Sequence, residues 1–152
     1  MTEIEFRARH SELIEYYQYI EMHLKGICAS FPEDENRTWF DMLDDYESDP
    51  FGKLLLTIQK YQNEKKVALF SAEDFSALDK IRKERNYWVH RCFAGDKDGH
   101  VIFKHGAVRD EEFVLRLNSD LHDAVDWDKK ITEIERMSIP WRSRSLNHEP
   151  GT

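Results

Sequence analysis

The sequence predicts an all-α protein, an antiparallel four-helix bundle with a short extended or hairpin insertion between its last two long helices. Only six Gly and four Pro occur among the 152 residues, too few for the many turns of an all-β fold. Hydrophobic residues make up 40% of the chain and charged residues 34%, as in a globular domain with one core. We therefore expect one helical domain at residues 1–139, followed by a flexible tail at residues 140–152.

The segment from Glu3 to Ala29 predicts the first long helix. Its apolar residues recur every seven positions with others between them, which is the pattern of a helix that packs along a partner helix. The residues of this seam are Phe6, Leu13, Tyr17, Ile20, Leu24 and Ile27.

Two shorter helices are expected next. The first spans Thr38 to Tyr46 and carries several large apolar side chains. The second has Asp49 as its cap and Pro50 at its first helical position, where the missing N–H of proline does no harm, and it ends near Asn63. The apolar face of this second helix consists of Phe51, Leu54, Leu55, Ile58 and Tyr61.

A central helix is expected from Ser71 to Phe93. The Ser71 hydroxyl can cap the free backbone N–H groups, and Asp74, three residues later, suits the positive end of the helix. No Gly or Pro interrupts the stretch before Gly95.

The apolar stripe of this central helix contains an arginine. At about 100° per residue, Arg85 falls in the middle of the stripe, while Asn86 and His90, four residues apart, stack along its edge. A charge in a packing stripe must be desolvated or compensated, so we expect a function to explain Arg85. The stripe consists of Phe75, Leu78, Val89, Cys92 and Phe93.

After the central helix, the segment from Gly95 to Gly99 predicts a turn. His100 to Lys104 is expected to be briefly extended and paired with Val108. A second long helix follows from about Asp110 to Met137, and Pro140 ends it. Its apolar residues, at three- and four-residue spacing, are Val114, Leu117, Leu121, Val125, Ile131 and Ile134.

Charge is unevenly distributed along the chain. The net charge is −8, which argues against a protein that coats nucleic acid non-specifically. Between Asp79 and Arg91, however, five basic residues face two acidic ones, a local charge of +3. A solvated helix face is the commonest explanation of such a cluster. Because this one coincides with Arg85, Asn86 and His90, we expect Lys80, Arg82, Lys83 and Arg91 to bind substrate.

No metal site or cofactor is expected. His90, Cys92, His100 and His105 are zinc-binding residue types, but positions 90 and 92 point about 200° apart on a helix and cannot converge on one ion. The same angle argues against a Cys92 nucleophile activated by His90. The segment from Asp96 to Gly99 lacks the remaining ligands of a calcium loop, and no paired-carboxylate spacing is present.

Arg85, Asn86 and His90 provide the groups for cleaving RNA without a metal. Cleavage requires a proton to leave the ribose 2′-OH, a proton to reach the departing 5′-oxygen, and charge stabilisation on the phosphoryl oxygens. Histidine can transfer the protons, and the planar cation of arginine can hold the charge. One histidine cannot readily be base and acid in one step, so a two-fold dimer with a second His90 would supply both.

These residues carry a resemblance. The segment RNYWVH, from Arg85 to His90, resembles the Arg-x4–6-His signature of the HEPN superfamily (higher eukaryotes and prokaryotes nucleotide-binding), in its form with a polar residue after the arginine. The resemblance covers roughly residues 3–137. It implies a dimeric four-helix bundle with metal-independent endoribonuclease activity of the toxin–antitoxin or abortive-infection type. Arg85 and His90 match the catalytic pair, and Asn86 matches the polar residue that supports it.

One departure from the family pattern concerns Cys92. In toxins paired with a minimal nucleotidyltransferase, a tyrosine lies two residues after the histidine, so control through a modified tyrosine is not expected at Cys92. The resemblance implies RNA as substrate, a second copy of the chain as partner, and an antitoxin protein as a further partner. The alternative is a non-catalytic module of the same fold that binds a nucleotide or a protein.

The expected compartment is the cytoplasm. The N-terminus lacks an apolar signal region, and no apolar run approaches the roughly 20 residues of a membrane span. The two cysteines show no disulfide-framework spacing, as in a protein of a reducing compartment.

Overall fold

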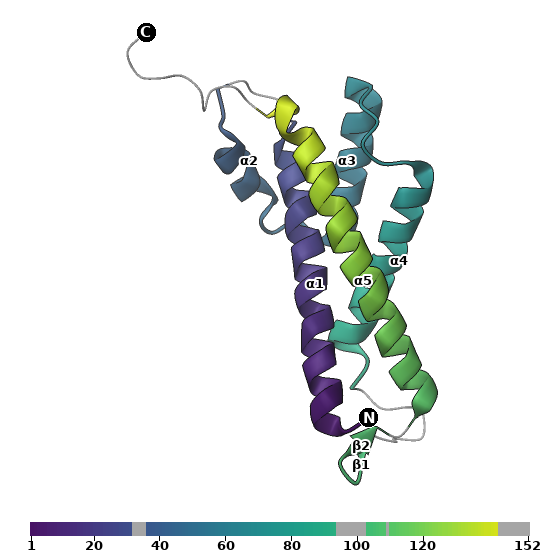
Figure 1. Cartoon of the computed structure of the whole chain (residues 1–152). Coiled ribbons are helices and arrows are strands. Elements are labelled where there is room, and N and C mark those ends of the chain that lie inside the picture. Colours follow the sequence, from purple (N-terminus) through teal and green to yellow (C-terminus); the bar gives the residue numbers. More distant parts are fainter. Residues whose placement is uncertain (32–35, 94–102, 109, 143–152) are drawn as a thin grey trace. The chain divides into compact units, whose positions relative to one another are not determined.

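The computed structural model describes residues 1–31, 36–93, 103–108 and 110–142. Its described residues form five α-helices, one short hairpin and a terminal 3-10 turn, which confirms the predicted all-α class (Figure 1). No described helix is long and apolar enough to span a membrane. The elements are α1 (Glu3–Ala29), α2 (Trp39–Tyr46), α3 (Phe51–Lys65), α4 (Ala72–His90), β1 (Phe103–Lys104), β2 (Ala107–Val108), α5 (Glu111–Ser138) and η1 (Ile139–Trp141).

The chain divides into two compact units. The first unit consists of Met1–Ile20 and Lys80–Asp128, and the second consists of Glu21–Asp79 and Lys129–Thr152. Helices α1, α4 and α5 each contribute residues to both units.

The predicted apolar seam of α1 is the core of this helix in both units. All six of its residues, from Phe6 to Ile27, have 0% exposure. Within each unit α1 packs against α5 (Figure 1): Arg9 donates to Asn118 in the first unit, and His23 bonds Glu135 in the second. The seam and its need for a partner helix are therefore confirmed.

The starts of α2 and α3 differ in their capping. Thr38 caps α2 through a reciprocal arrangement with Asp41, each side chain accepting the other's backbone N–H. In α3 the predicted cap is wrong, because Pro50 is the N-cap residue and no side chain caps the helix. Asp49 instead accepts from Lys53 over 3.1 Å, as an ion pair one turn into the helix. The predicted apolar face of α3, from Phe51 to Tyr61, is buried.

The predicted start of α4 is confirmed. Ser71 Oγ accepts from the Asp74 N–H over 3.1 Å, and the Asp74 carboxylate accepts from the Ser71 N–H over 3.0 Å. Lys130 of α5 also donates to the Asp74 carboxylate within the second unit. This capping box fixes where the helix that carries Arg85 begins.

The predicted apolar stripe of α4 is rotated relative to its buried face. Val89 and Phe93, which the sequence placed in the core, are 41% and 47% exposed. The buried face also contains a carboxylate, Glu84, that the apolar pattern did not include. Arg85 is half-buried rather than fully buried. The buried residues of α4 and the turn after it are Leu78, Ile81, Glu84, Trp88 and Cys92.

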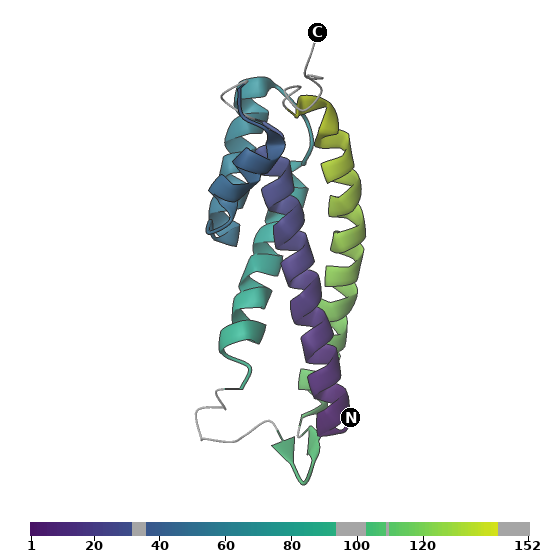
Figure 2. The same cartoon turned by 90° about the vertical axis from the view of Figure 1, so that its left-hand side faces the viewer.

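The predicted pairing of the insertion with Val108 is confirmed for its described part. Phe103 pairs with Val108 in the antiparallel hairpin, which lies at the N-terminal end of α1 (Figure 2). The Glu3 N–H donates to the Gly106 carbonyl over 2.8 Å, and this ties the hairpin to the first helix. The predicted turn at residues 95–99 and the extended residues 100–102 lie outside the described residues.

The end of α5 agrees with the expected stop at Pro140, but the next two residues are packed. Trp141 lies 6.1 Å from Phe31 between ring centroids, and the Arg142 guanidinium lies 4.2 Å above the Trp39 ring. Residues 141 and 142, which the sequence assigned to the flexible tail, therefore pack against residues of the second unit, although Trp141 stays 47% exposed.

Candidate functional site

The residues predicted to be catalytic lie on the last turns of α4, in the first unit. Asn86 and His90 are exposed, and Arg85 is half-buried. At helical spacing, Asn86 and His90 share one exposed row with Lys83, and Arg85 shares a neighbouring row with Arg82. We call these five residues the basic face of α4.

Arg85 and His90 do not point in the same direction from one helix. Five residues of an α-helix correspond to about 500° of rotation, so their side chains leave the axis about 140° apart. Asn86 and His90, one turn apart, are separated by only about 40°. A single copy of α4 thus places the amide beside the imidazole and directs the guanidinium elsewhere.

Two of the four predicted substrate-binding residues lie away from the basic face. Lys80 Nζ is 3.5 Å from the Glu84 carboxylate, on the side of α4 that turns toward the buried acid. Arg91 is exposed and follows the last helical residue. By helical spacing Lys80 lies about 80° and Arg91 about 100° from His90, whereas Lys83 lies about 20° from His90 and Arg82 about 40° from Asn86. Arg82 and Lys83 are therefore the two basic residues next to the predicted catalytic group.

Cys92 has a histidine neighbour, although not the one that the sequence suggested. His10 Nε2 lies 3.5 Å from Cys92 Sγ and 2.8 Å from the Trp88 carbonyl. Facing a carbonyl oxygen, this nitrogen must carry the proton and cannot accept one from the thiol. Burial raises the pKa of Cys92 to about 11, so the thiol stays protonated at neutral pH. The pair is not a nucleophile–base dyad.

The remaining residues of the zinc-type set do not form a described cluster. His105 occupies the turn of the hairpin with a φ of 53°, and it is exposed. His100 and the calcium-like segment at residues 96–99 lie outside the described residues.

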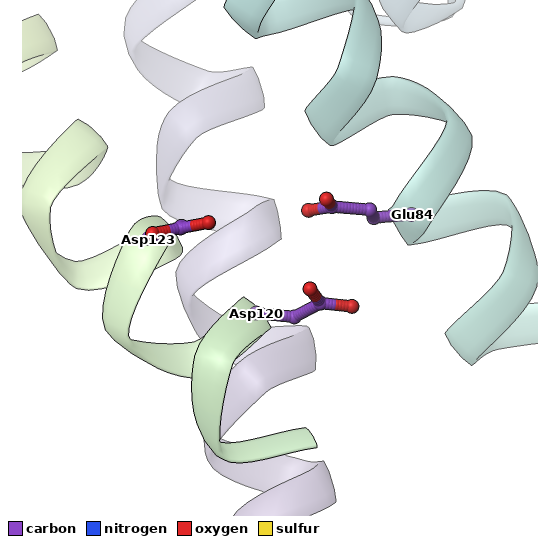
Figure 3. Close-up of side chains that lie close together, drawn as sticks. All are labelled: Glu84, Asp120 and Asp123. Carbon is purple, nitrogen blue, oxygen red and sulfur yellow. The ribbon is translucent and has the colours of Figure 1, made fainter. Parts of the chain in front are cut away.

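Three carboxylates converge on the other side of α4. Glu84 from α4 points toward Asp120 and Asp123 from α5, and one oxygen of each lies within 4.8 Å of the others (Figure 3). Glu84 and Asp120 are only 8% and 7% exposed, whereas Asp123 is partly exposed. We call these three residues the carboxylate cluster.

The surroundings of the carboxylate cluster disfavour its negative charge. Burial raises the pKa of Glu84, and the nearby charge of Asp120 adds to this effect. Burial also raises the pKa of Asp120, although the Trp88 indole N–H that it accepts over 2.7 Å acts in the opposite direction. The three carboxylates therefore lie close together at a site where their ionised forms are poorly solvated.

Sequence reasoning missed this cluster for an identifiable reason. The predicted absence concerned carboxylates spaced as a pair along the chain, whereas these three meet between two helices. A signal was present in each helix. Glu84 lies at helical spacing between Ile81 and Trp88, and Asp120 lies between Leu117 and Ala124, all four of them buried.

Comparisons of the chain with protein-family models, with curated proteins and with solved structures found no match. The functional argument consequently depends on the chain's own side chains.

Proposed function

We propose that this chain is a HEPN-like four-helix bundle that acts as a metal-independent endoribonuclease of the toxin or defence type. The observation that supports it best is the position of the RNYWVH segment. Of its three candidate catalytic residues, Asn86 and His90 are exposed and Arg85 is half-buried, so none of them is buried in the core. Polar groups kept at a surface, on a rigid helix, are available to a substrate.

The proposed chemistry assigns one role to each group. His90 removes the proton of the ribose 2′-OH or protonates the 5′-oxygen that departs. Arg85 holds the negative charge that develops on the phosphoryl oxygens, through two parallel N–H donors. Asn86, one turn before His90, donates to the substrate or orients the imidazole.

A second copy of the chain completes the proposed site. Because Arg85 and His90 diverge by about 140° on one helix, a guanidinium and an imidazole meet most simply when two α4 helices face each other across a two-fold axis. Val89, 41% exposed and one turn after Arg85 in the same row, supplies an apolar contact for such a pairing. The dimer also provides the second histidine that acid and base catalysis require.

Expression in a bacterial host tests the proposal. The wild-type chain should arrest growth, and His90→Ala should relieve the arrest while protein abundance stays unchanged. A matched control is His122→Ala, which removes a histidine that is 75% exposed on α5 and should leave the arrest intact. Growth arrest that persists in His90→Ala would reject the assignment of His90.

The second candidate function is a non-catalytic module of the same fold that binds a nucleotide or a protein. The net charge of −8 favours it, because an acidic chain repels RNA beyond the basic face. A purified chain that binds but does not cleave RNA would support this candidate. A neighbouring gene for an antitoxin or a nucleotidyltransferase would support the toxin instead, with that protein as partner in the cytoplasm.

A further inference from the structure

We propose that the carboxylate cluster, Glu84, Asp120 and Asp123, binds a hard divalent cation together with the hydroxyl of Tyr17. This site is distinct from the basic face and does not depend on the proposed ribonuclease activity. Its ligands come from α4, α5 and α1, all within the first unit. A cation here would join three helices.

The first argument is the spacing of the oxygens. One oxygen from each carboxylate lies within 4.8 Å of the other two. Oxygens bound to one Mg²⁺ at about 2.1 Å lie up to about 4.2 Å apart, and those bound to Ca²⁺ at about 2.4 Å lie up to about 4.8 Å apart. The three side chains can therefore share one ion after small rotamer adjustments. A ligand set made only of oxygens favours Mg²⁺, Mn²⁺ or Ca²⁺ over softer metals.

The second argument is independent of the carboxylates and comes from Tyr17. Its side chain has 0% exposure, and its hydroxyl is a buried polar atom without a hydrogen-bond partner among the described residues. Burial raises the pKa of Tyr17, the nearby charges of Asp120, Glu84 and Asp123 raise it further, and that of Arg116 lowers it. A cation, or a water bound to it, would satisfy the hydroxyl oxygen.

The third argument is that the basic neighbours compensate the cluster incompletely. Lys80 Nζ is 3.5 Å from Glu84, and its side chain is 70% exposed. Arg116 Nε is 3.8 Å from Asp120, beyond hydrogen-bond distance, and its guanidinium lies 3.7 Å above the Tyr87 ring. Two loosely placed cations thus face three acids, of which two are buried. A divalent ion would relieve the remaining repulsion.

Calorimetric titration of the full chain with MgCl₂, MnCl₂ or CaCl₂, each in a separate run at pH 7.5, tests the proposal. We expect saturable binding of one ion per chain and a matching rise in the unfolding temperature. Asp123→Asn, a change at a partly exposed position that spares the fold, should weaken binding about tenfold or more. Glu84→Gln should do the same. The matched control is Asp126→Asn, whose side chain is 61% exposed on the same helix and should bind like wild type.

Three outcomes would overturn the site. The first is the absence of saturable binding by all three ions. The second is binding that Asp126→Asn weakens as much as Asp123→Asn does, which would mean a diffuse attraction to acidic α5. The third concerns stability. If Glu84→Gln stabilises the protein equally with and without metal, the cluster relieves its repulsion by binding a proton and the cation proposal fails. None of these measurements involves RNA, so they are separate from the test of the ribonuclease.

Discussion

Trp88 donates its indole N–H to Asp120 Oδ2 over 2.7 Å, and this bond links α4 to α5 between two buried side chains. The ring of Trp88 also packs 5.2 Å from that of Phe113 and 6.5 Å from that of Phe6, between centroids. One residue of the RNYWVH segment therefore anchors the helix in the core of the first unit, while its neighbours Asn86 and His90 remain exposed.

The first prediction concerns this anchor. Trp88→Phe keeps most of the apolar surface but leaves the Asp120 carboxylate without its indole donor. We expect the free energy of unfolding to fall by about 2–4 kcal/mol, since a hydrogen bond to a charged group and part of a large side chain are lost. Urea denaturation followed by circular dichroism measures the change. The matched control is Trp141→Phe, a partly exposed position where the loss should be smaller. An equal loss in both variants would contradict the proposed role of the bond.

The helices could be predicted from the sequence because their apolar residues repeat at the helical period. The seam of α1 and the capping box at Ser71 are local features, and both are present as predicted. The pattern of apolar residues does not predict that a polar side chain will lie on the buried side of a helix. Glu84 is buried opposite Asp120, and Trp88 is buried with its N–H satisfied, so the core side of α4 turns away from Val89 and Phe93.

The candidate site was predictable only where it lies on a single helix. Arg85, Asn86 and His90 are recognisable as a group because six consecutive residues carry them. The carboxylate cluster joins residues 84 and 123, and only the packing of two helices brings these together. Arg142, assigned to the tail, donates to Glu135 and Ser30, and this contact too depends on tertiary structure alone.

The second prediction concerns the pH dependence of stability in the absence of divalent cations. The raised pKa values of Glu84 and Asp120 mean that the folded state binds protons more tightly than the unfolded chain, whose carboxyl groups have pKa values of about 4. Their stabilising contribution is complete below about pH 4 and is lost as the pH rises through their folded-state pKa values. The charged or titratable groups around this pair are Lys80, Arg116, Asp123 and Tyr17.

Acidification from neutral pH should therefore stabilise the protein until other carboxylates lose their partners. Hydrogen bonds from Thr38 lower the pKa of Asp41, and one from Arg37 lowers that of Asp45, so their contributions disappear as the pH falls below about 4. Thermal unfolding in EDTA between pH 4.5 and 8 measures the effect, and Glu84→Gln should flatten the curve. A wild-type stability that rises steadily toward pH 8 would contradict the prediction.

The third prediction is that the chain forms a symmetric dimer in solution. Val89→Lys adds a positive charge to the basic face and should shift the protein toward monomer by like-charge repulsion across the two-fold axis. The matched control is Leu56→Lys on α3, at a position that is 67% exposed and outside the proposed interface. Light scattering at micromolar concentration distinguishes the two states. A monomeric wild-type chain would exclude the composite site.

The fourth prediction is that RNA cleavage survives EDTA at temperatures where the protein stays folded. The proposed chemistry uses His90 and Arg85, and by helical spacing Glu84 leaves α4 more than 90° away from both His90 and Arg85. Chelation should lower the unfolding temperature through the carboxylate cluster without abolishing activity. Cleavage that disappears in EDTA and returns only with a divalent metal would assign the chemistry to a metal ion instead.

The fifth prediction orders the catalytic residues. His90→Ala should reduce the cleavage rate by about 10²–10⁴-fold, because it removes the proton-transfer group of both copies. Asn86→Ala should cost less, since the amide only orients or donates a hydrogen bond. Arg85→Lys should reduce the rate by about 10²-fold, because a point charge cannot reproduce the planar fork on a phosphate. The matched control for the arginine is Arg136→Lys on α5, where the side chain is 72% exposed.

The pH profile of the same reaction tests whether the two copies of His90 act as base and acid. If one His90 is the base and its symmetry mate the acid, the rate should be bell-shaped in pH, because one imidazole must be neutral while the other is protonated. A fluorescent RNA substrate measures the rates, and circular dichroism verifies that each variant is folded. A folded His90→Ala variant that cleaves at nearly the wild-type rate would reject the ribonuclease and leave the binding module. If the wild-type rate changed in only one direction with pH, two histidines would not act as base and acid. His90 would then remain as a single proton-transfer group.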